Sequence, residues 1–138
     1  MSYLIDTNVI SELRRRTPAP AVQSWFVERD SRSLYLSVLT IGEIRKGAEK
    51  MADRHRQQEI LDWLENDVRL FFADRILSID EAVAERWGRL AAAAKRPLPV
   101  IDSLLAATAL THDLCLVTRN VSDFELPGLD VFNPWDAG

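Results

Sequence analysis

The stretch Tyr3-Leu4-Ile5-Asp6-Thr7-Asn8-Val9-Ile10 decides the fold. Its first three residues are apolar and predict a short buried strand that ends at Asp6. Asp, Thr and Asn are typical of turns and helix caps. Val9 and Ile10 then begin a helical spacing of apolar residues, which Pro18 interrupts. A strand followed at once by a helix is the unit from which parallel sheets are built.

The same alternation of strand and helix continues along the chain. Further strands are expected at 34–36, 76–79, 114–118 and 131–132, and further helices at 21–27, 40–50, 54–67, 80–94 and 100–112. This order predicts a three-layer α/β/α fold with a mainly parallel central sheet of about five strands. The 138 residues suffice for one such domain and are too few for two, so we expect a single domain over 1–138.

The composition excludes several classes of protein. With 47% hydrophobic and 28% charged residues, the chain is typical of globular proteins. The single cysteine, Cys115, lies in an apolar run, and no spacing of Cys and His residues suits a zinc site. We expect neither a signal peptide nor a membrane span, and hence a cytoplasmic protein. The net charge of −4 argues against a broadly basic surface, although basic groups such as Arg14-Arg15-Arg16 are compatible with RNA.

Acidic side chains recur where the predicted strands end. Asp6 follows the first strand, Glu43 lies in the helix after the second, and Asp102 lies at the start of a later helix. Asn120 and Asp123 follow the strand at 114–118. Functional groups gather at the carboxyl ends of parallel strands, and several carboxylates there cannot all stay ionised without a cation. Mg²⁺ prefers oxygen ligands, so the pattern indicates a magnesium site.

Each of these residues also has a purely structural explanation. Asp6 could cap the following helix, and Thr40-x-x-Glu43 matches a capping box. Asp102 is favoured in a first helical turn, and Asp123 could be an ordinary loop residue. Asp102 nevertheless shares its helix face with small and apolar residues, namely Leu105, Ala106 and Ala109. For each residue taken singly, the structural explanation is favoured. The residues taken together, in this order along the chain, favour a metal site.

Five sequence blocks carry a resemblance to a known family. They are Leu4–Glu12, Leu36–Gly47, Ile101–Ala109, Val117–Phe124 and Phe132–Trp135. In order and spacing, over the whole chain, they resemble PIN-domain toxins of the VapC and FitB type. The Asp-Thr-Asn triplet alone is a weak signal, whereas the five blocks together are specific.

The resemblance implies a set of site residues. The family's metal carboxylates fall on Asp6, Glu43 and Asp102. The fourth position falls on Asp123, with Asn120 as the alternative, because FitB-like members carry an acid directly after the Thr-Arg pair. The supporting positions are Thr7, Asn8, Thr118 and Arg119. The first three would orient the ligands, and Arg119 would hold phosphates of the substrate.

The resemblance also implies a function. It is that of a Mg²⁺-dependent endoribonuclease, with Mn²⁺ as a substitute, that hydrolyses RNA phosphodiester bonds by a metal-activated water and leaves a 5′-phosphate. The enzyme would be the toxin of a type II toxin–antitoxin system and a homodimer, and would meet operator DNA only through its antitoxin. The alternative is a PIN-fold binding protein that acts mainly within an antitoxin complex on operator DNA.

Aromatic residues on the early helices, namely Trp25, Phe26 and Trp63, exceed what one small core is expected to need. Each one singly is expected to be a core residue. Together they could form a groove for a partner segment or a self-interface.

Overall fold

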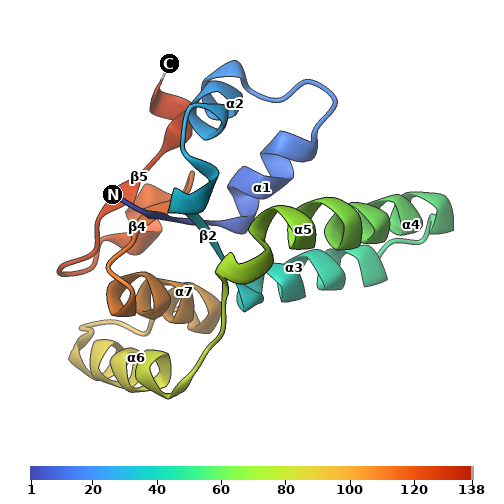
Figure 1. Ribbon diagram of the computed structural model, residues 1–138. Coiled ribbons are helices and arrows are strands. Elements are labelled where there is room, and N and C mark those ends of the chain that lie inside the picture. The colour runs from blue at the N-terminus through green and yellow to red at the C-terminus, as the bar shows by residue number, and fades with distance from the viewer. Residues whose placement is uncertain (138) are drawn as a thin grey trace.

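The computed structural model describes residues 1–137. Its centre is a sheet of five strands in the order β3-β2-β1-β4-β5, in which every neighbouring pair is parallel (Figure 1). The strands are β1 (Tyr3–Ile5), β2 (Leu34–Ser37), β3 (Ile76–Leu77), β4 (Cys115–Val117) and β5 (Val131–Phe132). Because β1 lies in the middle, the residue that follows it is enclosed from both sides.

Within residues 1–137, seven α-helices surround this sheet. They are α1 (Thr7–Arg14), α2 (Pro20–Val27), α3 (Val38–Glu49), α4 (Arg54–Trp63), α5 (Arg69–Phe72), α6 (Glu81–Ala93) and α7 (Val100–Thr111). A π-helical turn (Leu64–Val68) joins α4 to α5. Short 3₁₀ turns include η4 (Val121–Phe124) and η5 (Pro134–Ala137). Within residues 1–137, no helix is long and apolar enough to cross a membrane.

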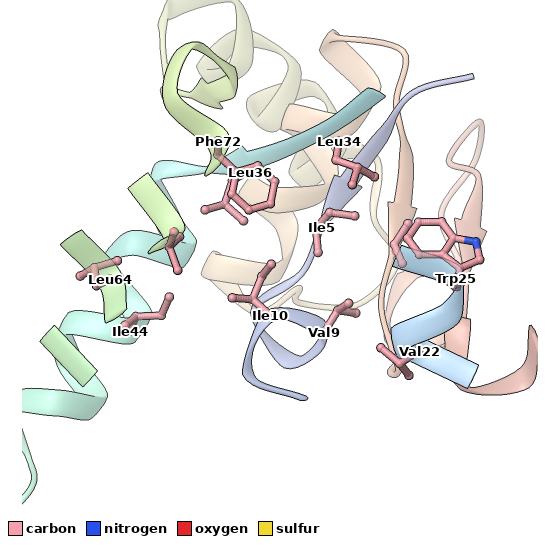
Figure 2. Packing of buried hydrophobic residues seen from close by; sticks show 12 residues of the cluster. Ile5, Val9, Ile10, Val22, Trp25, Leu34, Leu36, Ile44, Leu64 and Phe72 are labelled. Carbon is pink, nitrogen blue, oxygen red and sulfur yellow. The ribbon is translucent and has the colours of Figure 1, made fainter. Parts of the chain in front are cut away.

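The two faces of the sheet bury two separate cores. Ile5 and Val117 contribute to the first core, which is covered by α1, α2, α3 and the α4–α5 region (Figure 2). Leu4 and Leu116, their neighbours along the strands, belong to the second core beneath α7. Successive residues of a strand point to opposite faces, so one short apolar run serves both cores. The predicted three-layer α/β/α fold is thus confirmed.

The start of α3 differs from the prediction. Ser37, the last residue of β2, accepts a hydrogen bond from the N–H of Leu39 at 3.0 Å and is the N-cap. The helix therefore begins at Val38, without a connecting loop. Thr40 and Glu43 lie inside the helix, so the capping-box explanation of Glu43 is wrong.

Three further predictions need correction. The helix predicted over 54–67 continues through the π-helical turn to Phe72. The strand predicted over 76–79 ends at Leu77, and Asp80 caps α6 by accepting the N–H of Val83 at 3.0 Å. Trp25 is only 5% exposed and packs edge-on against the ring of Tyr3, so it is a core residue and not part of a groove.

Candidate active site

Asp6 is the innermost polar residue at the carboxyl edge of the sheet. It directly follows β1, is 9% exposed and caps α1, because its Oδ1 accepts the N–H of Thr7 at 2.7 Å. Its Oδ2 accepts the hydroxyl of Thr118 at 2.8 Å and the side-chain amide of Asn8 at 3.4 Å. Both carboxylate oxygens are thus held in fixed directions.

The parallel pairing of β1 with β4 explains how residues 112 positions apart meet. Ile5 is paired with Val117, so the next residue on each strand, Asp6 and Thr118, reaches the same edge. Asn8 reinforces the link, since its amide also donates to the Thr118 hydroxyl at 3.2 Å. The carbonyl oxygen of the same amide accepts the backbone N–H of residue 119 at 3.3 Å.

Glu43 reaches the same edge from α3. Its Oε1 accepts the hydroxyl of Thr7 at 2.6 Å, and that hydroxyl lies 3.0 Å from the Thr40 hydroxyl. Thr7 therefore joins the first turn of α1 to the first half of α3. The sequence pattern assigned Thr40 only to a capping box and not to this contact, because the partner Thr7 lies 33 positions away.

Asp102 approaches from the opposite face of the sheet. It lies in the first turn of α7 and is half-buried. The residues expected to share its helix face are buried in the second core, namely Leu105, Ala106 and Ala109. Packing along this strip holds the N-terminal end of α7, and with it the carboxylate, close to the other acids.

The pKa values show that the acids act on one another. Burial raises the pKa of Asp6 above its ordinary value of 3.8, hydrogen bonds from Thr118 and Thr7 oppose the shift, and the charges of Glu43 and Asp102 add to it. Burial also raises the pKa of Asp102, helped by the charges of Asp123 and Glu43. The four acids therefore form one electrostatic group, which we call the acidic group.

Asp123 and Asn120 occupy different places in this arrangement. Asp123 lies in η4 and contributes its charge to Asp102. Asn120 precedes η4, and its backbone N–H donates to the Thr118 hydroxyl at 3.1 Å. Both residues are exposed. Of the two residues, only Asp123 thus contributes to the repulsion among the acids.

The donor set suits a hard divalent cation. The acidic group offers carboxylate oxygens, with hydroxyl and amide groups behind them. These are the ligands that Mg²⁺ and Mn²⁺ accept, and a cation would relieve the repulsion that raises the pKa of Asp6 and Asp102. Among residues 1–137, no three His, Cys, Asp or Glu side chains lie close enough to share one ion.

Comparison with known families decides what this arrangement is. Residues 3–125 match the family model described as "PIN domain". The chain belongs to the PIN-domain family.

Individual relatives place this PIN domain more narrowly. It is 38% identical to the VapC ribonuclease Y4jK of Sinorhizobium fredii, with 96% of this chain and 97% of that protein covered. It is 35% identical to the toxin FitB of Neisseria gonorrhoeae, again over 96% and 97%. The crystal structure of FitAcB from Neisseria gonorrhoeae superposes with a TM-score of 0.90 at 34% identity, over 96% of this chain and 98% of that one. A structure of FitAB bound to a DNA fragment gives 0.87 at 32% identity, over 96% and 95%.

The PIN domain contains a further buried acid that sequence reasoning overlooked. Glu12, in α1, is 5% exposed, and its carboxylate accepts the N–H of Ala19 at 2.8 Å and a guanidinium N–H of Arg15 at 3.2 Å. The Ala19 hydrogen bond, then Arg15 and the charge of Arg119, lower its pKa. Glu12 follows Asn8 by one helical turn, so the sequence spacing alone places the two residues on the same face of the helix.

A hollow of about 220 Å³ opens beside the acidic group between α1, α3 and α4. Thr7 and Glu43 line one part of it, and Trp63 lies in its apolar part. A second hollow, of about 200 Å³, shares Trp63 and includes Phe26. Of the three aromatic residues singled out in the sequence, these two therefore line accessible hollows.

The raised pKa of Asp102 predicts a pH-dependent effect of Asp102→Asn. The fold disfavours the ionised form of the Asp102 carboxyl and favours the protonated form. Protonated Asp102 therefore adds to the free energy of unfolding below pH 3.8, its ordinary pKa. This contribution is lost as the pH rises through the higher pKa of the folded state. At neutral pH without divalent metal, Asp102→Asn should raise the Tm by a few degrees, and the gain should vanish in acid. Thermal melts over a pH series test this. Glu85→Gln, at an exposed site in α6, is the control and should shift little; a lower Tm of Asp102→Asn at neutral pH would contradict the prediction.

Proposed function

We propose that this PIN domain is a Mg²⁺-dependent endoribonuclease and the toxin of a type II toxin–antitoxin pair. The observation that carries the proposal is the meeting of Asp6, Glu43 and Asp102 charges from β1, α3 and α7 at one edge of the sheet. A module that only binds a partner has no need of a buried Asp6 whose ionisation is opposed by the charges of Glu43 and Asp102. Relatives named as a ribonuclease and as a toxin, at 38% and 35% identity over nearly the whole chain, support the same function.

The chain's own residues suggest how the site works. Asp6, Glu43 and Asp102 would hold the cation, with Asp123 as the fourth ligand. Thr7, Asn8 and Thr118 fix the directions of the carboxylates through the hydrogen bonds described above. When bound, a divalent cation polarises the scissile phosphate and lowers the pKa of the attacking water. Mg²⁺ fits because it keeps several waters and binds substrate phosphates readily, and Mn²⁺ should substitute.

Histidine has no part in this proposal. His55 pairs with Glu59 on the exposed side of α4, and His112 lies at the end of α7 opposite to Asp102. Proton transfer at the site therefore falls to the carboxylates. Because the substrate is RNA, we place the reaction in the cytoplasm.

A second role within an antitoxin complex on operator DNA is compatible with the first. The similar FitAB pair has a structure bound to DNA. In this chain, contact with operator DNA would run through the antitoxin. An intact acidic group does not exclude a DNA-bound complex. We therefore keep the nuclease as the primary proposal and regard the antitoxin complex on operator DNA as its regulated form.

The main test is cleavage of RNA by the purified chain. We expect cleavage with Mg²⁺ or Mn²⁺ and none in excess EDTA. Asp6→Asn should lower the rate by more than about a hundredfold, because losing a residue that merely orients a ligand already costs about 10- to 100-fold. Glu85→Gln, which removes one acid from the exposed side of α6, should leave the rate unchanged. Undiminished cleavage in EDTA would refute the proposal.

The fourth ligand is tested by a pair of variants. Asp123→Ala should reduce cleavage by about tenfold or more, and Asn120→Ala by less, because a charged oxygen binds a divalent cation more strongly than an amide oxygen does. Single-turnover rates at saturating Mg²⁺ compare the two. If Asn120→Ala were the more damaging, the assignment would be reversed.

The partners can be tested separately. We propose that an antitoxin covers the hollows at Trp63 and Phe26, and that a second copy of the chain covers exposed apolar residues near the acidic group, among them Val100 and Ile101. Light scattering should then give about twice the 15.7 kDa chain mass. Expression without antitoxin should arrest growth, and Asp102→Asn should abolish the arrest. A harmless monomer with all acids intact would contradict the toxin proposal.

A further inference from the structure

Arg119 is held against an aromatic ring of the C-terminal segment. Its guanidinium carbon lies 4.9 Å from the ring centroid of Trp135. Arg119 lies two residues beyond β4 and Trp135 lies three residues beyond β5, and these strands are paired side by side. The N–H of Thr118 donates to the Phe132 carbonyl at 2.9 Å and continues the pairing to the residue before Arg119. The contact between arginine and indole thus follows from strand register.

The indole is a fixed support. The backbone N–H of Trp135 donates to the side chain of Asn133 at 2.9 Å, and the ring packs half-buried against the first core. The segment that carries it, η5, lies against α2 (Figure 1). Trp135 lies outside residues 3–125, the part of the chain that matches the PIN-domain model. The support for Arg119 thus lies beyond the matched region, in the block Phe132–Trp135 that resembles the VapC and FitB toxins.

The guanidinium remains available to a ligand. Arg119 is exposed, and its backbone is tied to Asn8, which also donates to Asp6. Within residues 1–137, no carboxylate oxygen lies within 4.0 Å of its guanidinium nitrogens. The buried carboxylate of Glu12 is close enough to sense its charge, but it is already bonded to Ala19 and Arg15.

We propose that Trp135 is the positioning residue that holds the Arg119 guanidinium for the phosphate contact expected of it, with a phosphate of the RNA strand next to the acidic group. An arginine stacked on an indole keeps its planar face covered while its N–H donors point outward in a fork that matches phosphate oxygens. The order imposed by the ring before binding lowers the entropy lost on binding.

RNA fits this position better than an acidic protein segment does. The inference rests on the proposed function, because a strand whose scissile phosphate lies at the acidic group brings its neighbouring phosphates past Arg119. The carboxylates of the acidic group repel any polyanion. The Arg119 guanidinium beside them offsets this repulsion for an RNA strand that binds across the site. An acidic peptide has no reason to approach the carboxylates.

The position of the contact predicts its kinetic effect. Arg119 lies over the ring of Trp135, and its charge helps to lower the pKa of Glu12 in α1, a residue outside the acidic group. A phosphate bound there is not the one that reacts, so the contact is equally strong in the ground state and the transition state. Its loss should therefore raise KM and leave kcat nearly unchanged.

The experiment measures binding and cleavage separately. Binding of a fluorescein-labelled single-stranded 2′-O-methyl RNA, which resists cleavage, is followed by anisotropy in EDTA over a series of salt concentrations. Arg119→Gln should weaken binding by about tenfold and make the slope of log K against log salt shallower by about 0.7, the value for one phosphate contact on a single strand. Arg89→Gln removes the same charge from the exposed side of α6 and should leave the slope unchanged.

Two further variants test the role of the ring. Arg119→Lys keeps the charge but loses the planar contact, so binding should weaken severalfold with an unchanged slope. Trp135→Leu should have the same effect and Trp135→Phe should restore most of the affinity, with thermal melts to confirm that both are folded. Because Arg119→Lys leaves the packing of Trp135 intact, the test survives if Trp135→Leu fails to fold.

The possible outcomes separate this inference from the proposed function. Equal losses for Arg119→Gln and Arg89→Gln, no binding by the wild-type chain at low salt, or Arg119-dependent capture of a poly-glutamate peptide in place of RNA would overturn the inference. RNA cleavage with an unchanged KM in Arg119→Gln would leave the nuclease standing and remove the arginine contact. Arg119-dependent binding without Mg²⁺-dependent cleavage would support the arginine contact and contradict the proposed nuclease.

Discussion

Repulsion of the buried Asp6 and the half-buried Asp102 by neighbouring carboxylates is the constraint on which the rest of this structure depends. Asp6 is fixed at the end of the central strand, so it cannot turn toward solvent without losing the hydrogen bonds that cap α1. Glu43 and Asp102 then arrive from opposite faces of the sheet, and their charges raise the pKa of Asp6 further. The fold thus maintains a concentration of negative charge that destabilises it, which is typical of a site selected for function.

The hydrogen bonds that hold this charge also hold the fold together. Thr7 connects α1 to α3, while Thr118 and Asn8 connect the end of β4 to the start of α1. Each contact joins segments that are distant in sequence, so the acidic group forms only when the sheet and both layers of helices are assembled. The same hydrogen bonds therefore determine both the geometry of the site and the packing of these segments, so a change in one alters the other.

The sequence predicts the parts of this network that depend on local pattern. The unit β1-Asp6-α1 follows from an apolar run, cap residues and helical spacing, and the acids follow from a family resemblance. The start of α3 was mispredicted because Thr40-x-x-Glu43 matched a capping pattern, whereas Ser37 caps the helix directly from the strand end. The π-helical turn after α4 has no simple apolar period that would reveal it. The contact from Thr7 to Glu43 depends on packing between helices and has no signal in sequence spacing.

The charge of the whole chain explains why one placed arginine matters. At a net charge of −4, long-range attraction does not favour RNA, so affinity must come from a few local contacts. An arginine held on Trp135 beside the acidic group supplies such a contact only to a strand that also crosses the carboxylates. A broadly basic surface would hold RNA in many registers, most of them unproductive. A single supported cation next to a repulsive site instead favours the register in which a phosphodiester bond lies at the carboxylates.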